Sequence, residues 1–372
     1  MAGLLVHEWI ELSGGAEKVL GAMASAFPDA DIQCLWNDDG GAFESRNVYE
    51  TWFASTALRR AKALALPLMV PTWRTLRSHR HYEWMLISSH LFAHHARLRR
   101  QPDVPKLAYV HTPARYIWVP EIDDRGQSMP VRMAAPALRR LDRNRASELT
   151  SVAANSQYIR ERIQRSWEVD ARVIYPPVEV SRITAVDDWP SQVSDVERAT
   201  LDALPAEFLF GASRLVAYKR LDAVIQMGST LGMPVVVAGS GPDEERLRAL
   251  AAASRVPVTF VGAPSDQMLY ALYQRALAYV FLAVEDFGIM PVEAMACGTP
   301  VLVGSVGGAA ESVTSCEGGV VVDNAVERDE LEVALEAVGS VDRAALRGRV
   351  RKFSRERFTE EIRNWVGQES GW

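Results

Sequence analysis

This 372-residue sequence contains little cysteine and no long apolar run, and each shortage excludes a class of proteins. Its three cysteines are far apart and odd in number, so they predict neither a disulfide framework nor a metal site. No apolar run approaches the roughly 20 residues that a membrane-spanning helix needs. The apolar start, Gly3 to His7, is too short and polar for a signal peptide and is expected to form the first strand. We therefore expect a reduced, cytoplasmic protein.

An excess of positive charge is also missing, which argues against a general nucleic-acid binder. The 41 lysines and arginines are outnumbered by 47 aspartates and glutamates, giving a formal net charge of -6. Hydrophobic residues make up 48% of the chain, which is enough to bury two cores, so two domains are expected. From Phe208 onward, β-type runs alternate with helical segments, as in parallel sheets covered by helices. The expected fold class is α/β.

A stretch centred on two acids is the most informative part of the sequence. An apolar run at residues 278–284 ends in Glu-Asp-Phe-Gly, and a short helix is expected to open with Pro291 and close at Gly298, before another strand at residues 301–303. Loops at the carboxyl ends of parallel strands bind ligands in α/β proteins, and a helix start provides free N–H groups suited to phosphate. This stretch is therefore a candidate ligand site.

The two acids of this stretch, Glu285 and Glu293, are eight residues apart. Glu285 is expected on the loop and Glu293 at the third helical position, so both carboxylates can face one ligand. Each acid alone has a plainer interpretation. Glu285 is then a solvated loop residue, and Glu293 is a carboxylate that offsets the helix dipole.

Two cations and a pair of glycines are further candidates for binding phosphate. Arg214 and Lys219 follow a buried strand at residues 208–212, and together they can hold the negative charge of a diphosphate. Gly14 and Gly15 open an expected helix, where a backbone without side chains can approach a diphosphate closely. Taken alone, the cations are ordinary surface charges and the glycines an ordinary turn.

The histidines fall into two groups. Five lie between residues 79 and 95, and His90 and His94 are four apart, but the His-Glu-x-x-His arrangement of a zinc site is missing. These side chains are expected at the surface or packed, with no metal. His111 instead follows an expected strand at residues 107–110, where α/β domains present ligand groups. The alternative for His111 is a histidine that packs in the core or caps a loop.

The segment at residues 58–106 is strongly basic and contains interleaved aromatic residues and leucines. This mixture fits a helix on an anionic membrane surface, or a groove for a lipid-phosphate acceptor. The alternative is a solvated cationic face with an ordinary buried side. The hypothesis is peripheral attachment to the inner face of the plasma membrane. The aromatic residues named for it are Trp73, Tyr82 and Trp84, and the basic ones include Arg59, Arg60, Lys62, Arg74, Arg77, Arg80, Arg97, Arg99, Arg100 and Lys106.

Together these motifs resemble the signature of the family-four retaining glycosyltransferases over nearly the whole chain. The resemblance is carried by the two acids with Phe-Gly after the first and Ala-Met-Ala-Cys-Gly-Thr-Pro after the second. It is also carried by Tyr-x-His-Thr-Pro-x-Arg-Tyr at residues 109–116, Ala-Asn-Ser at residues 154–156 and Ser-Arg-Leu-x-x-x-Lys-Arg at residues 213–220. The basic segment matches no strict motif of the family, which leaves the acceptor open.

The resemblance implies the GT-B fold, in which two Rossmann-like domains face each other across a cleft. The acceptor domain is expected at residues 1–178, with a C-terminal helix at residues 353–372 crossing back to it. The nucleotide-sugar domain is expected at residues 179–352. An acidic stretch with two prolines, residues 187–205, is expected to be a linker or a surface insertion.

The resemblance also assigns roles to single residues. His111 and Glu285 would position the donor sugar, and Arg214 and Lys219 would stabilise the leaving diphosphate. No metal and no cofactor are implied. The expected contacts to the donor are Gly14, Gly15, Val261 near the base, Phe287, Gly288, Ile289 and Met290 through the loop, and Glu293 at the ribose.

The expected function is that of a retaining hexosyltransferase with a nucleotide-diphospho-sugar donor. The sequence looks most like bacterial mannosyltransferases of polysaccharide or lipid-linked glycan assembly, so GDP-mannose is favoured over a UDP-sugar, and a glycan or polyprenyl-linked acceptor is expected. One alternative is a nucleotide-sugar epimerase of the same fold. Another is a non-catalytic subunit that binds nucleotide-sugars or membranes. A phosphorylase is disfavoured because no pyridoxal-lysine segment is evident.

Overall fold

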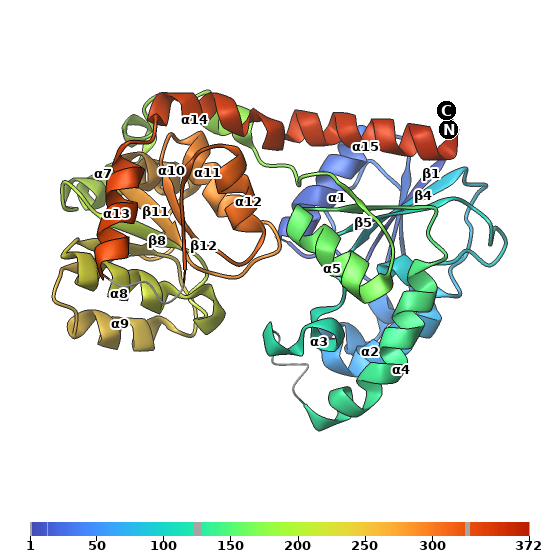
Figure 1. Ribbon diagram of the computed structural model, residues 1–372. Coiled ribbons are helices and arrows are strands. Elements are labelled where there is room, and N and C mark those ends of the chain that lie inside the picture. Colours follow the sequence, from blue (N-terminus) through green and yellow to red (C-terminus); the bar gives the residue numbers. More distant parts are fainter. Residues whose placement is uncertain (1, 13, 123–127, 324–327, 372) are drawn as a thin grey trace. The chain divides into compact units, whose positions relative to one another are not determined.

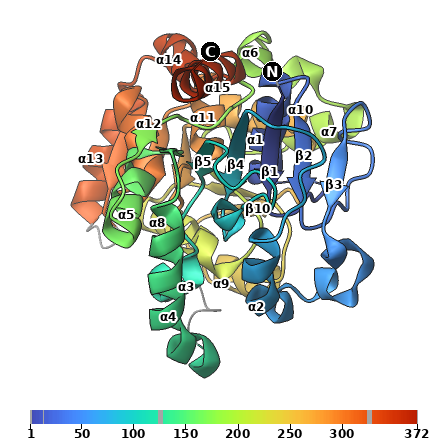
Figure 2. The ribbon, with the colours of Figure 1, turned by 90° about the vertical axis from the view of Figure 1, so that its right-hand side faces the viewer.

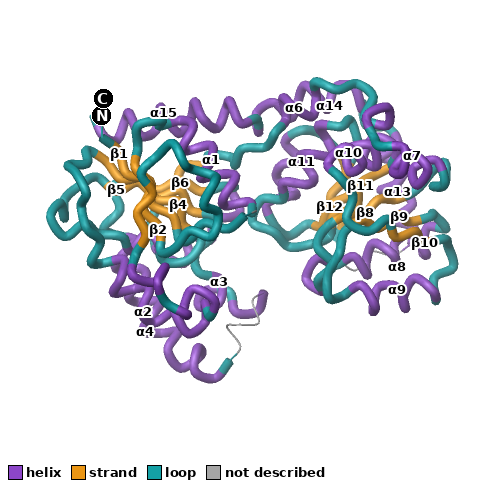
Figure 3. The backbone as a smooth tube through the Cα atoms, turned by 180° about the vertical axis from the view of Figure 1, so that it is seen from behind, coloured by secondary structure: helices purple, strands orange, loops and turns teal. Residues whose placement is uncertain are grey.

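The computed structural model describes residues 2–12, 14–122, 128–323 and 328–371, and the chain divides into two compact units. The first unit comprises residues 1–177 and 356–372, and the second comprises residues 178–355. Each unit contains its own sheet, whose strands are parallel and lie between helices (Figures 1 and 3). The expected α/β class is therefore confirmed.

The sheet of the first unit has the strand order β3-β2-β1-β4-β5-β6-β7. Its central strands are buried along their whole length, because helices cover both faces and the strands need no alternation of polar and apolar residues. Figure 2 shows β3 at the edge of this sheet, beside β2. The strands are β1 (Gly3–His7), β2 (Asp31–Cys34), β3 (Val48–Glu50), β4 (Trp84–Ser89), β5 (Lys106–Val110), β6 (Ser151–Ala154) and β7 (Arg172–Val173).

Two hydrophobic cores form on opposite faces of this sheet. Along β1, Leu5 packs with the core of α1 and α15, whereas Leu4 and Val6 pack with the core beneath α2 and α5, because successive strand residues face opposite sides. The helical segments are α1 (Gly15–Ala26), η1 (Trp52–Ser55), η2 (Ala57–Arg60), α2 (Lys62–Trp73), η3 (Ala93–His95), α3 (Arg115–Trp118), η4 (Pro120–Ile122), α4 (Met129–Ala146), α5 (Gln157–Trp167) and α15 (Arg355–Ser370).

The second unit has a sheet with the order β10-β9-β8-β11-β12-β13. The strands are β8 (Leu209–Ala212), β9 (Val235–Ala238), β10 (Val258–Phe260), β11 (Ala278–Phe281), β12 (Val301–Gly304) and β13 (Gly319–Val322). The helical segments are α6 (Val180–Thr184), η6 (Pro190–Gln192), α7 (Asp195–Asp202), η7 (Ala217–Lys219), α8 (Leu221–Leu231), α9 (Glu244–Ala252), α10 (Asp266–Arg275), α11 (Ile289–Ala296), α12 (Gly308–Ser315), α13 (Arg328–Gly339), α14 (Arg343–Arg349) and η8 (Val350–Phe353).

Each sheet contains a point where the strand order reverses. In the first unit, the chain moves outward from β1 to β2 and β3 and then returns to the other side of β1 with β4. In the second unit, the chain moves outward from β8 to β9 and β10 and then returns to the other side of β8 with β11. In open α/β sheets, ligands bind beyond the carboxyl ends of the strands at such a point. The loops after β1 and β4, and those after β8 and β11, are therefore the places to look for a site.

The acidic stretch at residues 187–205, expected to be a linker or a surface insertion, is not a linker. Most of this stretch folds into η6 and α7, and α7 begins where the Ser194 hydroxyl accepts the N–H of Glu197. The Trp189 side chain is buried, and its indole N–H donates to the carbonyl of Ile183 at 3.1 Å. Leu201 is buried as well. The acidic residues form the solvent side of a packed segment.

The basic segment at residues 58–106 has an ordinary buried side. Its aromatic residues Trp73, Tyr82 and Trp84 belong to the cores of the first unit rather than to a membrane-facing surface. Among the described helices, none combines the length and the apolarity that crossing a bilayer requires. Half of the named basic side chains form ion pairs, and these are Arg59 with Asp38, Lys62 with Glu11, Arg74 and Lys106 with Glu148, and Arg80 with Asp31.

Candidate functional site

In the second unit, two of the predicted catalytic residues meet at the point of strand reversal. Lys219 ends η7 in the loop after β8, and Glu285 lies in the loop after β11. The Lys219 ammonium and the Glu285 carboxylate form an ion pair, with side chains 13% and 25% exposed. A half-buried pair is screened less by solvent than a surface pair. The structure thus brings together a cation and an acid that lie 66 positions apart in the sequence.

Arg214 lies nearby on the same loop as Lys219 but faces a different neighbour. Its guanidinium donates to the Tyr218 hydroxyl at 2.9 Å, and the side chain is exposed. Arg214 lines a cavity of about 290 Å³ together with Gly239, Pro264 and Met290. Among the described residues that line this cavity, neither predicted acid occurs. Arg214 and Met290 therefore share one hollow, and the acids lie outside its lining.

The loop that carries Glu285 rests on two glycines at the start of α12. The N–H of Gly308 donates to the Glu285 carbonyl at 2.8 Å. A β-carbon on Gly308 would lie 2.2 Å from the carbonyl oxygen of Asp286, and Gly307 has a φ of 117°. Glycines are required here because two stretches of backbone touch.

Replacing Gly308 by alanine is expected to push the loop of Glu285 away from α12. We expect the free energy of unfolding to fall by about 1–3 kcal/mol, the usual cost of forcing an extra methyl group into a packed site, and transfer activity to fall with it. Gly339→Ala is the matched control, because a β-carbon there meets nothing within 4 Å, so stability should be unchanged or slightly raised. Urea unfolding of both variants checks this. Equal stabilities would show that the glycine contact does not hold the loop.

The helix after the loop differs from the prediction. It begins at Ile289 rather than Pro291, because Gly288 adopts a left-handed φ of 83° and Pro291 fits inside the first turn, where no N–H is needed. Glu293 is therefore the fifth helical residue, not the third. It is only 9% exposed. Because it lies beyond the first turn, the structure does not favour its plainer interpretation as a carboxylate that offsets the helix dipole.

Glu293 is surrounded by tyrosines of its own unit. Burial and then the charge of Glu293 raise the pKa of Tyr279, and burial and the same carboxylate contribute to raising that of Tyr270. Tyr279 itself donates to the carbonyl of Ala212, at the end of β8, at 2.9 Å. Glu293 thus lies in the core beside the strands that carry the candidate site.

Two further predicted donor contacts, Phe287 and Val261, have different surroundings. The Phe287 ring is buried and packs at 5.5 Å against Phe353, so only its main chain can meet a ligand. Val261 follows β10 and donates its N–H to the carbonyl of Val237 at 3.0 Å. It lies two residues before Ala263, which lines the cavity beside Arg214.

In the first unit, the strand ends bring together polar side chains around His111. The Ser88 hydroxyl lies 2.9 Å from His111 Nε2 and 3.1 Å from His7 Nδ1. Burial and the neighbouring His90 lower the pKa of His7 to about 4, and the same two causes hold the pKa of His111 well below its ordinary value. Both imidazoles are therefore neutral near pH 7.

The buried Glu8 carboxylate lies beside this group of polar side chains. Glu8 follows β1 and accepts the N–H groups of Leu91 and Ala93 at 2.8 and 2.9 Å, and its other oxygen lies 3.3 Å from His90 Nδ1. Burial alone would raise the pKa of Glu8, but the neighbouring imidazoles of His90 and His7 and these N–H groups lower it.

Sequence reasoning missed His7, Glu8 and Ser88. The signal was present, because each of them lies at the end of an apolar strand, as His111 does. What could not be read from that position was which strand ends are neighbours.

The predicted glycine turn lies at the start of α1, with Ser13 outside the described residues. Gly14 precedes the helix, and the Glu17 side chain folds back toward it, so that a β-carbon on Gly14 would lie 2.0 Å from a Glu17 oxygen. The same carboxylate accepts the N–H of Glu11 at 3.4 Å. Gly15 is exposed as the first helical residue. A phosphate at this helix start would have to displace the Glu17 carboxylate.

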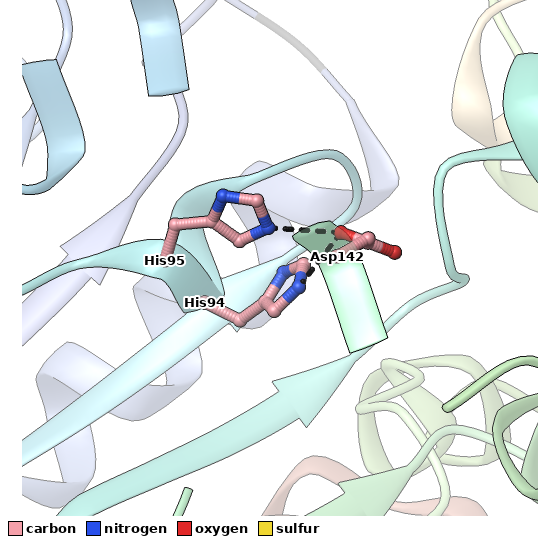
Figure 4. A group of neighbouring side chains, drawn as sticks. All are labelled: His94, His95 and Asp142. Carbon is pink, nitrogen blue, oxygen red and sulfur yellow. Dashed lines mark hydrogen bonds and ion pairs between the residues drawn. The ribbon is translucent and has the colours of Figure 1, made fainter. Parts of the chain in front are cut away.

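His94, His95 and Asp142 form a buried group whose atoms are close enough to hold a metal ion (Figure 4). Both imidazole Nε2 atoms approach one oxygen of Asp142, at 3.0 and 2.9 Å. The other oxygen accepts the indole N–H groups of Trp118 and Trp167, each at 2.7 Å. We interpret the group as a hydrogen-bonded centre of the core, because donors engage both carboxylate oxygens. His90 is not part of it and pairs with Glu8 instead.

Comparison with known proteins covers nearly the whole chain. The family described as Glycosyltransferase Family 4 matches residues 13–182, and that described as Glycosyl transferases group 1 matches residues 197–357. A GDP-mannose-dependent alpha-(1-6)-phosphatidylinositol monomannoside mannosyltransferase of Mycobacterium tuberculosis is 31% identical over 210 residues, which are 52% of this chain and 54% of that protein. A D-inositol 3-phosphate glycosyltransferase of Jonesia denitrificans is 26% identical over 277 residues, 68% of this chain and 63% of that protein. The matched region thus spans about half the length of the first relative.

Solved structures agree on the architecture. Anabaena HepE in complex with UDP matches with a TM-score of 0.70 at 18% identity, covering 99% of this chain and 100% of that one. Sucrose-phosphate synthase of Thermosynechococcus elongatus matches with a TM-score of 0.71, also at 18% identity, covering 99% and 98%. Two adjoining family matches and a shared architecture along the whole length lead to one conclusion: the chain belongs to the family 4 glycosyltransferases and has the GT-B fold.

Proposed function

We propose that this protein is a retaining hexosyltransferase that moves a sugar, with mannose favoured, from a nucleotide-diphospho-sugar to a glycan or lipid-linked acceptor. The observation that carries the proposal is the Lys219–Glu285 pair beside Arg214 at the strand reversal of the second unit. This is where an α/β sheet binds its ligand, and it combines cations for a diphosphate with an acid for a sugar hydroxyl.

The second unit would carry the charge of the leaving group. Departure of the nucleotide diphosphate builds negative charge, and fixed cations such as Arg214 and Lys219 stabilise it most effectively where water is excluded. The ion pair engages Oε1 of Glu285, so Oε2 is available to accept a sugar hydroxyl. Glu293 is proposed for the ribose, and the loop from Phe287 to Met290 for N–H contacts to sugar and phosphate.

In the first unit, His111 is proposed to position the donor sugar. Ser88 engages Nε2 of His111, which leaves Nδ1 of a neutral imidazole to meet a donor hydroxyl. No side chain is assigned as a nucleophile. By analogy with the family, the acceptor attacks on the face from which the diphosphate departs, and a phosphate oxygen takes its proton. Gly14 and Gly15 are proposed to approach the diphosphate once the Glu17 carboxylate has moved.

GDP-mannose is the favoured donor because the Mycobacterium tuberculosis relative is described as GDP-mannose-dependent. HepE was solved with UDP, but at 18% identity it supports the fold alone. We also propose that the basic segment at residues 58–106 contacts an anionic membrane surface, and that only its basic side chains make this contact. Absence of co-sedimentation with anionic vesicles at low salt would remove it.

The direct test is a thermal-shift screen against GDP-mannose, UDP-glucose, ADP-glucose and TDP-glucose, followed by an assay for sugar transfer. A donor present at 100 times its Kd stabilises the folded state by about 2.7 kcal/mol. At equal concentrations the donor that binds most tightly gives the largest shift in Tm, and we expect this donor to be GDP-mannose. Conversion of a UDP-sugar without an acceptor would indicate an epimerase. Binding without turnover on any acceptor would indicate a non-catalytic subunit, and no shift with any nucleotide-sugar would contradict the proposal.

A further inference from the structure

One cavity of the first unit lies beside the edge strand β3, apart from the histidines around Ser88. Its volume is about 460 Å³. The end of β3 contributes Glu50 and the following Trp52, and the segments that return from α2 and precede β5 contribute Arg77, His79 and Arg99. None of the histidines near Ser88 lines it.

The positive charges that face this cavity differ from most of their neighbours in having no carboxylate partner. In the same part of the chain, Arg74, Arg80 and Lys106 are each neutralised by an ion pair. Arg77 and Arg99 form no ion pair with any residue that the structure describes. Two guanidiniums at one hollow suit an anion with several oxygens, because each can donate two parallel hydrogen bonds.

The remaining polar groups of the cavity restrict what else can bind. The hydroxyls of Thr51, Thr72 and Thr75 already donate to backbone carbonyls at 2.9, 2.8 and 3.2 Å, so the free donors are mainly the guanidiniums. Glu50 accepts the N–H of Asn37 with one oxygen at 2.6 Å, which leaves its second oxygen to accept from a ligand hydroxyl. The cavity thus offers donors for an anion and an acceptor for a hydroxyl.

A fixed aromatic ring completes the lining. Trp52 stacks on Phe53 with ring centroids 4.3 Å apart and an interplanar angle of 22°, and its N–H donates to Thr72 at 3.1 Å. The residue is nevertheless 49% exposed. A half-exposed indole held in place offers an apolar face to the C–H groups of a ring-shaped ligand at little cost in side-chain entropy.

We propose that this cavity binds a sugar that carries a phosphate or carboxylate group. The anion would lie between Arg77 and Arg99, a hydroxyl would donate to Glu50, and the sugar ring would rest on Trp52. A neutral sugar would leave both guanidiniums without a partner, and a bare anion would not use the indole. This binding requires neither the nucleotide-sugar nor the transfer reaction.

Isothermal titration calorimetry on the full chain tests this, with glucose 6-phosphate, glucuronate, inorganic phosphate and glucose as ligands. We expect at least one acidic sugar to bind, and glucose to bind more than tenfold more weakly. Arg77→Gln and Arg99→Gln should each weaken that binding by roughly tenfold or more, since each removes charged hydrogen bonds. Trp52→Ala should weaken binding of the acidic sugar but not of inorganic phosphate. Comparing the two acidic sugars identifies the preferred anion.

Arg97→Gln and Arg100→Gln are matched controls, because these arginines are exposed and lie in the same segment but outside the cavity lining. They should bind the acidic sugar as the unchanged protein does. Absence of binding by the folded protein would overturn the proposal, and so would equal losses in the control variants. Inorganic phosphate binding as tightly as glucose 6-phosphate would overturn the sugar part. GDP-mannose titrated into the same variants should bind unchanged, which separates this cavity from the donor site.

Discussion

Replacing Lys219 by methionine is expected to lower kcat for sugar transfer by roughly 100- to 1,000-fold, the loss that follows removal of one preorganised group that stabilises transition-state charge. Methionine keeps much of the length of the side chain but cannot carry positive charge toward the departing diphosphate. The effect should be on kcat more than on KM, because the charge develops as the bond to the sugar breaks. Steady-state kinetics with GDP-mannose, or with the donor found in the thermal-shift screen, measures it.

Three variants distinguish a role in chemistry from a role in folding. Lys219→Arg keeps the charge and should retain more activity than Lys219→Met, whereas Arg220→Gln changes the next cation, which is partly exposed, and should have little effect. If Lys219 only neutralises Glu285, the double variant Lys219→Met, Glu285→Gln should recover activity. If both residues act on the donor, the double variant should stay inactive. An unchanged kcat in Lys219→Met would remove the residue from the mechanism.

Replacing Asp142 by asparagine is expected to destabilise the first unit by about 3–5 kcal/mol, the usual cost of breaking a buried charged group. Burial alone would raise the pKa of Asp142, but the neighbouring His94 and His95 and their hydrogen bonds hold it below its ordinary value. Two imidazoles and two indole N–H groups converge on its oxygens. An asparagine amide would turn its own N–H groups toward one pair of these donors and leave them unsatisfied.

Urea unfolding followed by tryptophan fluorescence measures the change in the free energy of unfolding. Asp170→Asn is the control, because Asp170 forms an exposed ion pair with Arg160, and such pairs contribute little. Dialysis against a chelator should leave the unchanged protein as stable as before if Asp142 is held by hydrogen bonds alone. A loss of less than about 1 kcal/mol in Asp142→Asn would contradict the proposed strength of this centre.

Elements with strong local signals were predicted well from the sequence. The strand at residues 3–7 has the predicted bounds, and the strand predicted at residues 107–110 is β5, which begins one residue earlier. Apolar runs of four or five residues between polar neighbours have one favourable arrangement in a covered parallel sheet. Helix α5 likewise has a local start signal, because the Ser156 hydroxyl accepts the N–H of Ile159.

Elements were predicted wrongly where packing outweighs local preference. Proline at position 291 marks the first turn of a helix but not its first residue, and Gly288 decided where α11 begins. The acidic stretch at residues 187–205 was mistaken for a linker because its few apolar residues, such as Trp189 and Leu201, are spaced too widely to show a period. For the aromatic residues of the basic segment, a membrane-facing surface and a buried side stayed open as alternatives, because sequence alone does not distinguish a buried ring from an exposed one.

By itself, the sequence determined which polar residues end apolar strands and which glycines allow close backbone contacts, because strand length and turn chemistry are local properties. Only the tertiary structure decided which strand ends lie side by side. The order of strands in a parallel sheet depends on packing between distant segments, so Ser88 meets His7 from 81 positions away and Lys219 meets Glu285 from 66. The same long-range packing gathered two imidazoles and two indoles around Asp142, and it left Arg77 and Arg99 at a cavity without an ion-pair partner among the described residues.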